Sequence, residues 1–301
     1  MIADGILLID KAAGMTSHDV VARVRRILGL KSVGHCGTLD PMATGLMILL
    51  IGEATKVSPY LLERDKAYVL KAQLGVTTDT LDTTGQVLTT KPVTTAVADV
   101  KDLALSLQGE FELNVPKYSA VKVQGEKMYE KARRNEDFET PKKIMKFYDV
   151  EVLDQGPDWL KASLKCSKGS YIRSWIEMLG GKTGSGAAMS ELRRTISEPF
   201  FLENAMTLEE LAQAIEKGET PRALTPLAQT LPHWKSARVD GQSLAMMRNG
   251  QISKDLKSIL ITLYQPDVDQ GVKILSKDGE LLALIGLEEG KGFVVRRVFR
   301  S

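Results

Sequence analysis

Cysteine and histidine are scarce in this chain, and the few that are present stand far apart. The 301 residues include two cysteines, Cys36 and Cys166, and three histidines. Two isolated cysteines cannot build a disulfide framework, and neither they nor the histidines have the spacing of a zinc site. The sequence therefore argues against a disulfide-stabilised secreted scaffold and predicts no metal centre.

Long apolar runs and a strong excess of one charge are also missing. No segment approaches the roughly 20 apolar residues of a membrane span, and the start, Met1 to Gly5, lacks the basic head and apolar body of a signal peptide. These absences predict a cytoplasmic protein without a membrane partner. The net charge of +2 does not by itself predict a nucleic-acid binder. With 43% hydrophobic residues, the chain can form one large domain and a small one.

Motifs for phosphate and metal cofactors are absent or weak. The segment from Gly180 to Gly186 is glycine-rich, but Ile176 and Met189 stand where a Walker A loop and a dinucleotide-binding loop need glycine. We interpret this segment as a turn between two helices. Asp79 and Asp82 could hold magnesium, although Thr-Asp-Thr-Leu-Asp is equally typical of a polar turn.

The stretch from Gly34 to Gly45, GHCGTLDPMATG, presents one carboxylate on a constrained backbone. Its glycines permit tight bends, and Pro41 biases Asp40 toward extended geometry. From residue types alone, Asp40 is either a fixed functional carboxylate or, more commonly for such a pattern, a turn aspartate with a local hydrogen bond.

Together with its neighbours, this stretch resembles the G-H-x-G-T-L-D-P-x-A-x-G signature of the TruB family of tRNA pseudouridine synthases. Further blocks follow in the family's order between Lys11 and Thr195: KAAGMTSHD, GEATK, DKAY, TDTLDTTG, PKYSAVKVQG, GSYIR and LRRT. Two departures are Ala12, where the family usually has proline, and Val115-Pro116, where it usually has two prolines.

The resemblance implies an α/β (α+β) fold with a catalytic domain over residues 1–232, built on one mixed, mostly antiparallel sheet of the pseudouridine synthase type. A small C-terminal β-rich, PUA-like RNA-binding domain would follow over 233–301. Independently, the short apolar runs after Pro232, separated by glycines, predict a β-rich module. Its expected strands are Ser258–Tyr264, Val272–Leu275, Glu280–Ile285 and Phe293–Val298, with a hairpin turn at Asp278-Gly279.

Hydrophobic periodicity predicts the elements of the larger domain. Strands are expected over Ile6–Ile9, Leu46–Ile51, Ala67–Leu74 and, as a hairpin, Lys143–Leu153 with Trp159–Cys166. Helices are expected over His18–Leu28 with Ser17 as its cap, Thr55–Leu62, Val97–Leu107, Met128–Arg134, Ser170–Leu179 and Leu208–Glu216. The polar segment from Asn135 to Lys143 is predicted to be a mobile loop.

The implied reaction is isomerisation of uridine to pseudouridine, which transfers no electrons, so no cofactor is expected. The resemblance assigns the catalytic role to Asp40, either as the nucleophile at the ribose carbon or as the base that starts elimination to a glycal. Arg173 would keep Asp40 ionised, and Tyr68 would stack on the target base and take part in proton transfer. The simpler alternatives are a surface ion pair for Arg173 and core packing for Tyr68.

The resemblance assigns substrate contacts to a second set of residues: His35, Tyr171, Leu192, Lys11, Lys56, Lys142 and Lys143. His35 would fill the space that the flipped uridine leaves, although a lone histidine is more often structural, and Tyr171 and Leu192 could equally be core. The segment 116–146 carries nine basic and five acidic residues with aromatics between them. Such a stretch suits an RNA-gripping insertion, whereas a solvated charged surface is the commoner origin of a charge run.

The resemblance therefore implies a stand-alone, bacterial-type enzyme that acts on uridine 55 in the T-arm of tRNA, as a monomer without an obligate protein partner. A guide-RNA-dependent relative that works in a multi-protein particle is one alternative, and a tRNA-folding chaperone is another. The guide-dependent class tends to carry basic extensions, and their absence around the first and last expected strands favours the stand-alone enzyme.

Overall fold

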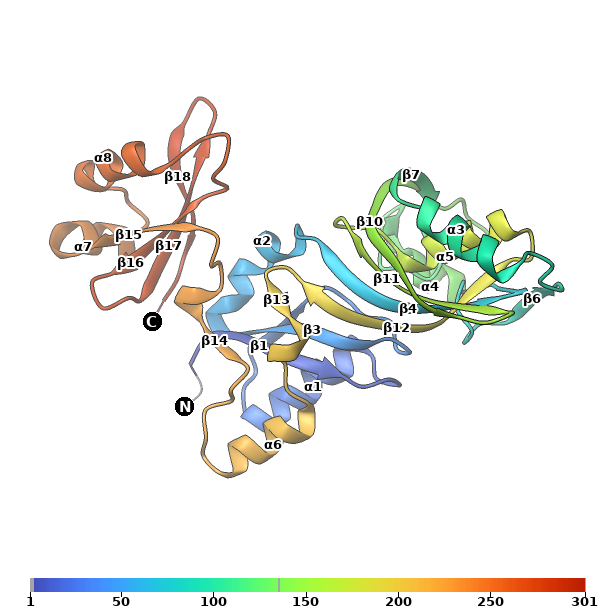
Figure 1. The fold of residues 1–301 in the computed structure, drawn as a ribbon. Coiled ribbons are helices and arrows are strands. Elements are labelled where there is room, and N and C mark those ends of the chain that lie inside the picture. The colour runs from blue at the N-terminus through green and yellow to red at the C-terminus, as the bar shows by residue number, and fades with distance from the viewer. Residues whose placement is uncertain (1–2, 135, 301) are drawn as a thin grey trace.

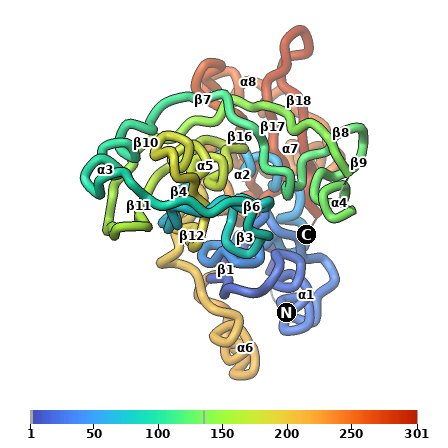
Figure 2. Tube along the Cα trace, turned by 90° about the vertical axis from the view of Figure 1, so that its right-hand side faces the viewer, coloured from blue at the N-terminus to red at the C-terminus, as the bar shows by residue number. Residues whose placement is uncertain are grey.

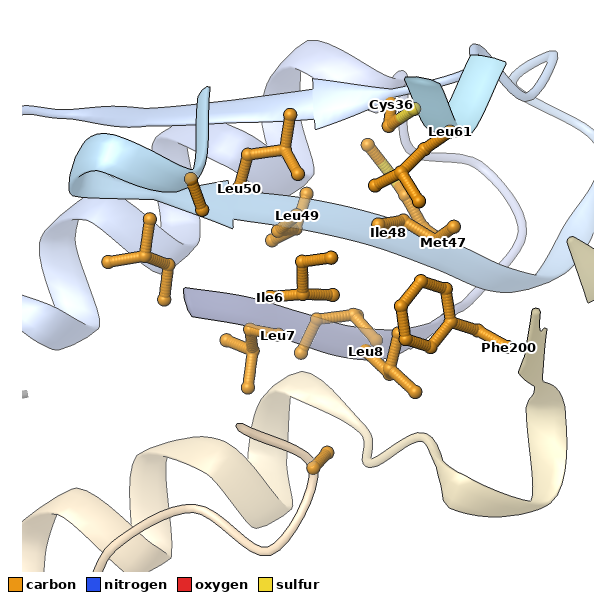
Figure 3. Packing of buried hydrophobic residues seen from close by; sticks show 14 of the residues in the cluster. Ile6, Leu7, Leu8, Cys36, Met47, Ile48, Leu49, Leu50, Leu61 and Phe200 are labelled. Carbon is orange, nitrogen blue, oxygen red and sulfur yellow. The ribbon is translucent and has the colours of Figure 1, made fainter. Parts of the chain in front are cut away.

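Two apolar strands, β1 (Gly5–Lys11) and β3 (Thr44–Ile51), pair antiparallel and lie in the core of the larger domain. In the computed structural model, which describes residues 3–134 and 136–300, nearly every residue of both strands is buried. Because both faces are covered, these strands are continuous apolar runs without alternating polar residues. Figure 3 shows the side chains of Ile6–Leu8 beside those of Ile48–Leu50 in this core.

These strands belong to a ten-stranded sheet in the order β14-β1-β3-β12-β4-β11-β10-β7, with β2 paired to β3 and β13 paired to β12. The other strands are β2 (Val33–Cys36), β4 (Lys66–Leu74), β7 (Gly109–Asn114), β10 (Lys142–Gln155), β11 (Trp159–Cys166), β12 (Ala187–Ser197), β13 (Phe200–Phe201) and β14 (Leu224–Pro226). Among the described residues, every pairing in this sheet is antiparallel except that of β3 with β12. The predicted mixed, mostly antiparallel sheet and the predicted β10–β11 hairpin are confirmed.

Helices gather at the two ends of this sheet. α1 (Ser17–Leu28) contacts α6 (Leu208–Glu216) near β1, whereas α3 (Val97–Ser106) contacts α5 (Ile172–Thr183) near β10 and β12 (Figure 1). The larger domain accordingly has two hydrophobic clusters, one at each end. The remaining predicted helices also form, as α4 (Met128–Arg133) and as the consecutive η1 (Gly52–Val57) and α2 (Ser58–Leu62).

Two local predictions at helix ends are wrong. Thr16, and not Ser17, caps α1: its hydroxyl accepts from Asp19 N at 3.1 Å, and the Asp19 carboxylate accepts from Thr16 N at 2.9 Å. This reciprocal pair satisfies two N–H groups at the start of the helix. The glycine-rich segment after α5 joins a helix to a strand, because α5 ends at Thr183 and β12 begins at Ala187.

Two short hairpins and two single turns stand outside the large sheet. They are β5 (Val76–Thr78) with β6 (Val87–Thr90), β8 (Lys122–Val123) with β9 (Glu126–Lys127), and the turns η2 (Leu202–Asn204) and η3 (Leu227–Gln229). Figure 2 shows β8, β9 and α4 together at one edge of the molecule. The predicted loop before β10 is shorter than expected, since Lys142 and Lys143 pair with β7. Its first residue, Asn135, lies outside the described residues.

The C-terminal module contains more helix than predicted. It is formed by β15 (Lys235–Val239), α7 (Gly241–Arg248), α8 (Lys254–Leu263), β16 (Val272–Ser276), β17 (Leu281–Glu288) and β18 (Gly292–Val298). The predicted strand over Ser258–Tyr264 is wrong: Ser253 caps α8, and Leu256 and Leu260 bury one face of it at helical spacing. The strands form a sheet in the order β15-β16-β17-β18, and the predicted turn at Asp278-Gly279 joins β16 to β17. None of the described helices in the chain is both long enough and apolar enough to cross a membrane.

The C-terminal module shares a hydrophobic core with the larger domain. Trp234, Leu275, Leu281, Leu284 and Phe299 belong to the same cluster of buried residues as the strands β1 and β3. Trp234 also meets the ring of Tyr60, on α2, edge to face at a centroid distance of 4.9 Å. The module is therefore packed against the larger domain and not merely tethered to it.

Trp234→Ala should lower the free energy of unfolding by about 3–5 kcal/mol, because it removes a buried aromatic side chain from this shared core. The side chain is 5% exposed. Urea unfolding followed by circular dichroism measures the change. Trp234→Phe should lose less than half as much, since it keeps an aromatic ring opposite Tyr60. An unchanged transition midpoint in Trp234→Ala would show that the module docks without this contact.

Candidate active site

Asp40 lies in the loop between β2 and β3, and the sheet restricts how this loop can run. Gly45 has φ +97°, and a Cβ added there would lie 2.3 Å from the backbone oxygen of Arg194 on the parallel neighbour β12. Only glycine combines that backbone conformation with so close an approach. The position of β3 against β12 thus depends on the last residue of the signature stretch.

Side chains from β1 and α1 hold the backbone on both sides of Asp40. Ser17 Oγ accepts from Leu39 N at 2.9 Å and donates to Leu39 O at 3.0 Å. Lys11 Nζ donates to Pro41 O at 3.1 Å and to Ala43 O at 2.6 Å. The loop is therefore anchored at the residues directly before and after the carboxylate.

Lys11 was predicted to grip RNA, but its placement is structural. The residue is fully buried, and its ammonium group also donates to Ala12 O at 2.9 Å. Burial lowers the pKa of Lys11 to about 8, while the nearby Asp40 charge acts in the opposite direction. The ammonium group of Lys11 is therefore not accessible to an RNA phosphate. Its hydrogen bonds hold the loop that carries Asp40.

Asp40 forms an ion pair with Arg173, which stands in the first turn of α5. Arg173 Nη2 lies 3.2 Å from Asp40 Oδ2 and donates to Tyr118 O at 2.9 Å, and Nη1 donates to Thr80 O at 3.2 Å. The side chain of Arg173 is only 6% exposed, whereas that of Asp40 is 31% exposed. The alternative of a surface ion pair is wrong, and the carboxylate is the member of the pair that solvent can reach.

Opposing effects set the ionisation of Asp40. Burial raises the pKa of its carboxyl group above the ordinary value, the Arg173 charge lowers it, the Asp82 charge raises it, and Lys11 lowers it. The net direction is upward, because removal from water disfavours the charged form more than the cations favour it. A carboxylate in such surroundings is a better base than one in water.

Asp82 is the residue at this site that the sequence interpretation missed, having considered it only as a turn or magnesium residue. Its side chain is buried, and Oδ1 accepts from Thr80 Oγ1 at 2.8 Å and from Thr84 N at 3.0 Å. These bonds are those of a polar turn, and no group of three or more metal-ligating side chains occurs in residues 3–134 and 136–300. The turn places a second negative charge near Asp40. Because the two residues are 42 positions apart in the chain, no local sequence motif indicates that they are close.

Tyr68, Tyr171 and Leu192 share a hydrophobic cluster with residues of the loop. All three belong to, or pack against, the cluster that contains Leu39 and Ala43, the buried neighbours of Asp40 in sequence. Burial raises the pKa of Tyr68 to about 12, so its phenol keeps its proton near neutral pH. Tyr68 on β4, Leu192 on β12 and Tyr171 directly before α5 thus share one cluster with the buried neighbours of Asp40.

The other predicted RNA-contacting residues lie in different surroundings. His35, on β2, is half-buried, and burial and then the nearby His18 lower its pKa, so its imidazole is neutral at neutral pH. Lys56 pairs with Glu53 and donates to Val298 O at 2.9 Å, which links η1 to the C-terminal module. This placement makes Lys56 a contact between the domains, and its side chain remains 33% exposed. Lys142 and Lys143 are exposed at the start of β10, with Lys142 Nζ 3.6 Å from Glu112.

Ion pairs within the segment 116–146 neutralise some of its basic side chains. Arg134 lies 2.6 Å from both Glu126 and Glu136, and Lys117 lies 3.9 Å from Asp137. Such exposed pairs contribute little stability but reduce the field that an RNA phosphate would meet. The segment nevertheless reaches the site, since the backbone oxygen of Tyr118 accepts from Arg173.

Two protein families together match most of the chain. Residues 25–172 match the family described as TruB family pseudouridylate synthase (N terminal domain), and residues 173–231 match the one described as tRNA pseudouridylate synthase B C-terminal domain.

Several curated relatives are named tRNA pseudouridine synthase B. A tRNA pseudouridine synthase B of Bdellovibrio bacteriovorus is 53% identical over 299 residues, which is 99% of this chain and 97% of the relative. Proteins of the same name from Syntrophobacter fumaroxidans and Geobacillus thermodenitrificans are 37% and 34% identical, over 93% and 99% of this chain and 92% and 100% of theirs.

Solved structures with the same fold include larger assemblies. The structure of an H/ACA RNP bound to a substrate RNA containing 2′-deoxyuridine matches with a TM-score of 0.70 and 26% identity, over 99% of this chain and 85% of that one. A Cbf5-Nop10-Gar1 complex matches with a TM-score of 0.70 and 27% identity, over 98% and 84%. Because two family descriptions match consecutive parts of the chain and relatives match it over nearly its full length, this chain belongs to the TruB family of pseudouridylate synthases.

Proposed function

We propose that this chain converts uridine 55 in the T-arm of tRNA to pseudouridine, with Asp40 as its catalytic group. The name shared by the curated relatives supports tRNA as the substrate. The observation that carries the catalytic assignment is the ion pair of a partly exposed carboxylate with a buried guanidinium, 3.2 Å apart, on a loop anchored on both sides. No cofactor takes part in the proposal.

The reaction breaks the bond between ribose C1′ and uracil N1, turns the base, and joins C1′ to C5. The proton on C5 is lost and N1 gains one, so substrate and product have the same composition. Ionised Asp40 acts either by attacking C1′ or by removing the proton from C2′ to give a glycal. Arg173 favours the ionised form at the start of either route, because its charge opposes the effect of burial.

We propose that Tyr68 stacks on the flipped base and takes part in proton transfer, and that Tyr171 and Leu192 form further walls of the pocket; their shared hydrophobic cluster with Leu39 and Ala43 supports this. His35 is proposed to enter the space that the base leaves. The exposed residues of the segment 116–146, including Lys142 and Lys143, would contact phosphates, and residues 233–301 would add a second RNA-binding surface to the catalytic domain over 1–232. We propose that the enzyme is a cytoplasmic monomer with no obligate protein partner.

The guide-dependent alternative is less well supported than the tRNA-acting enzyme. The structures that match at 26% and 27% identity are ribonucleoprotein or multi-protein complexes, whereas a relative at 53% identity over nearly the whole chain is named for tRNA. Activity of the purified protein on bare tRNA transcript distinguishes the two. The chaperone alternative predicts that loss of the Asp40 carboxylate leaves the RNA-directed function intact.

Asp40→Asn should reduce pseudouridine formation in tRNA by about 10³-fold or more while tRNA affinity changes little, because the amide keeps the size of the side chain but is neither nucleophile nor base. Single-turnover assays and filter binding measure the two effects. Asp149→Asn is a matched control, since Asp149 pairs with Lys165 on the surface and has φ +52°, which asparagine tolerates. Activity of Asp40→Asn within tenfold of wild type would remove Asp40 from the catalytic role.

Arg173→Gln should move the acid limb of the rate–pH profile to higher pH. Without the guanidinium, burial and Asp82 act unopposed by the main cation, so the pKa of Asp40 rises and less carboxylate is ionised at low pH. Activity should therefore be lost first at the acid end and recover as the pH exceeds the new pKa. Single-turnover rates across a pH series measure the shift, and an acid limb in the wild-type position would show that Arg173 does not control the ionisation of Asp40.

Replacing Lys142 and Lys143 by Ala should weaken tRNA binding and reduce its salt dependence. For each phosphate that the variant no longer neutralises, the slope of log K against log salt should become shallower by about 0.7 to 0.9. Removing two charges from α3 and α5, with Lys101→Ala and Lys182→Ala, should leave the slope unchanged. Equal slopes in the two double variants would identify the start of β10 as an ordinary solvated surface.

A further inference from the structure

Arg194 is a buried cation whose side chain donates to three carbonyl oxygens. It stands on β12 and is 1% exposed. Its Nε donates to Leu46 O at 2.7 Å, Nη2 to Gly37 O at 3.3 Å and Nη1 to Thr38 O at 3.5 Å. None of the ion pairs within residues 3–134 and 136–300 involves Arg194.

An unpaired buried charge is costly, so these contacts call for an explanation beyond packing. A neutral apolar residue would fill the same space in the core without that cost. A guanidinium differs in presenting five N–H donors in a rigid plane, which suits several carbonyl oxygens at different points of a bent backbone. Here the acceptors lie before Asp40, at Gly37 and Thr38, and after it, at Leu46.

The position of Arg194 in the sheet connects the loop to the base-stacking side of the site. On one neighbour, β3, Arg194 is registered with Gly45; on the other, β4, it stands opposite Tyr68. The guanidinium charge and a hydrogen bond favour the ionised form of Tyr68, against the larger opposing effect of burial on the pKa of that phenol. One side chain thus lies between the backbone that carries Asp40 and the ring of Tyr68.

We propose that Arg194 is a positioning residue for the isomerisation, with its buried guanidinium tying the loop before Asp40 to β3 and holding both relative to Tyr68. This inference rests on the proposed function. It differs from the role of Arg173, which contacts the carboxylate itself. The pKa of Asp40 is shifted by burial, Arg173, Asp82 and Lys11. Since Arg194 is not one of these causes, its proposed effect is on the geometry of the loop.

The test compares Arg194→Gln, Arg194→Lys and the neighbouring control Arg193→Gln in single-turnover pseudouridine formation on tRNA. Arg193 is on the same strand but is 42% exposed and pairs with Asp10 at 2.6 Å. Arg194→Gln should lower the rate about 10²-fold, the loss expected when a catalytic group is misplaced by about 1 Å. Arg194→Lys should recover part of that loss, because it keeps the charge and at least one carbonyl contact. Arg193→Gln should stay within threefold of wild type.

Two further readouts separate positioning from general stability. The tRNA dissociation constant of Arg194→Gln should stay within threefold of wild type, and its acid limb should keep the wild-type position, in contrast to Arg173→Gln. Rates should be measured well below the thermal transition of each variant, so that a loss of folded protein does not enter the comparison.

The proposal is overturned if Arg194→Gln is as active as Arg193→Gln, or if its rate and its tRNA affinity fall by the same factor. If Arg194→Gln does not fold, Arg194→Lys decides: a rate at least threefold below wild type with unchanged tRNA affinity supports positioning, and a wild-type rate refutes it. Failure of the proposed function is a separate outcome, because the wild-type protein would then leave tRNA unmodified.

Discussion

The carboxylate of Asp40 has to be charged in a place where burial disfavours charge, and much of the larger domain is arranged around that conflict. Arg173 supplies the opposing cation, and its burial is tolerated because carbonyl oxygens of Tyr118 and Thr80 accept from it. Those two residues come from the 116–146 segment and from the turn that contains Asp82. Arg173 therefore joins helix α5, the basic segment and the β5–β6 turn to the carboxylate.

Three cationic side chains from three elements contact the same short loop, and each contact has a different role. Arg173 pairs with the carboxylate, whereas Lys11 from β1 and Arg194 from β12 donate to backbone oxygens near it. Hydrogen bonds to charged donors are stronger than those between neutral groups, especially where water is excluded. The parallel pairing of β3 with β12 places Arg194 beside Gly45, where this loop ends. The direction of Asp40 is thus determined by the sheet as much as by its own turn.

The sequence predicted what depends on local pattern and family signature: most helices and strands, the mixed sheet and the family. It did not predict where charged side chains would point. Lys11 and Lys56 are ordinary lysines in sequence, and only the sheet and the C-terminal module supply the oxygens that hold them. Arg194 stood inside a recognised block without a role, and Asp82 resembled a turn residue, because their partners are remote in the chain. The wrong strand over Ser258–Tyr264 has a local cause: the apolar run included the exposed Ile259 and Ile261, which hid the helical spacing of Leu256 and Leu260.

The packing of the C-terminal module changes how a second RNA-binding surface could contribute. A flexibly linked module raises affinity through effective concentration and accepts RNAs with many spacings between the two contacts. Here Trp234 and Phe299 lie in the core of the larger domain, and Lys56 joins η1 to Val298 across the boundary. The distance between the Asp40 loop and any contact on the module is then set by a hydrophobic core. Such a rigid arrangement adds affinity only for an RNA whose own shape matches that distance, so the module would select among folded RNAs in addition to holding them.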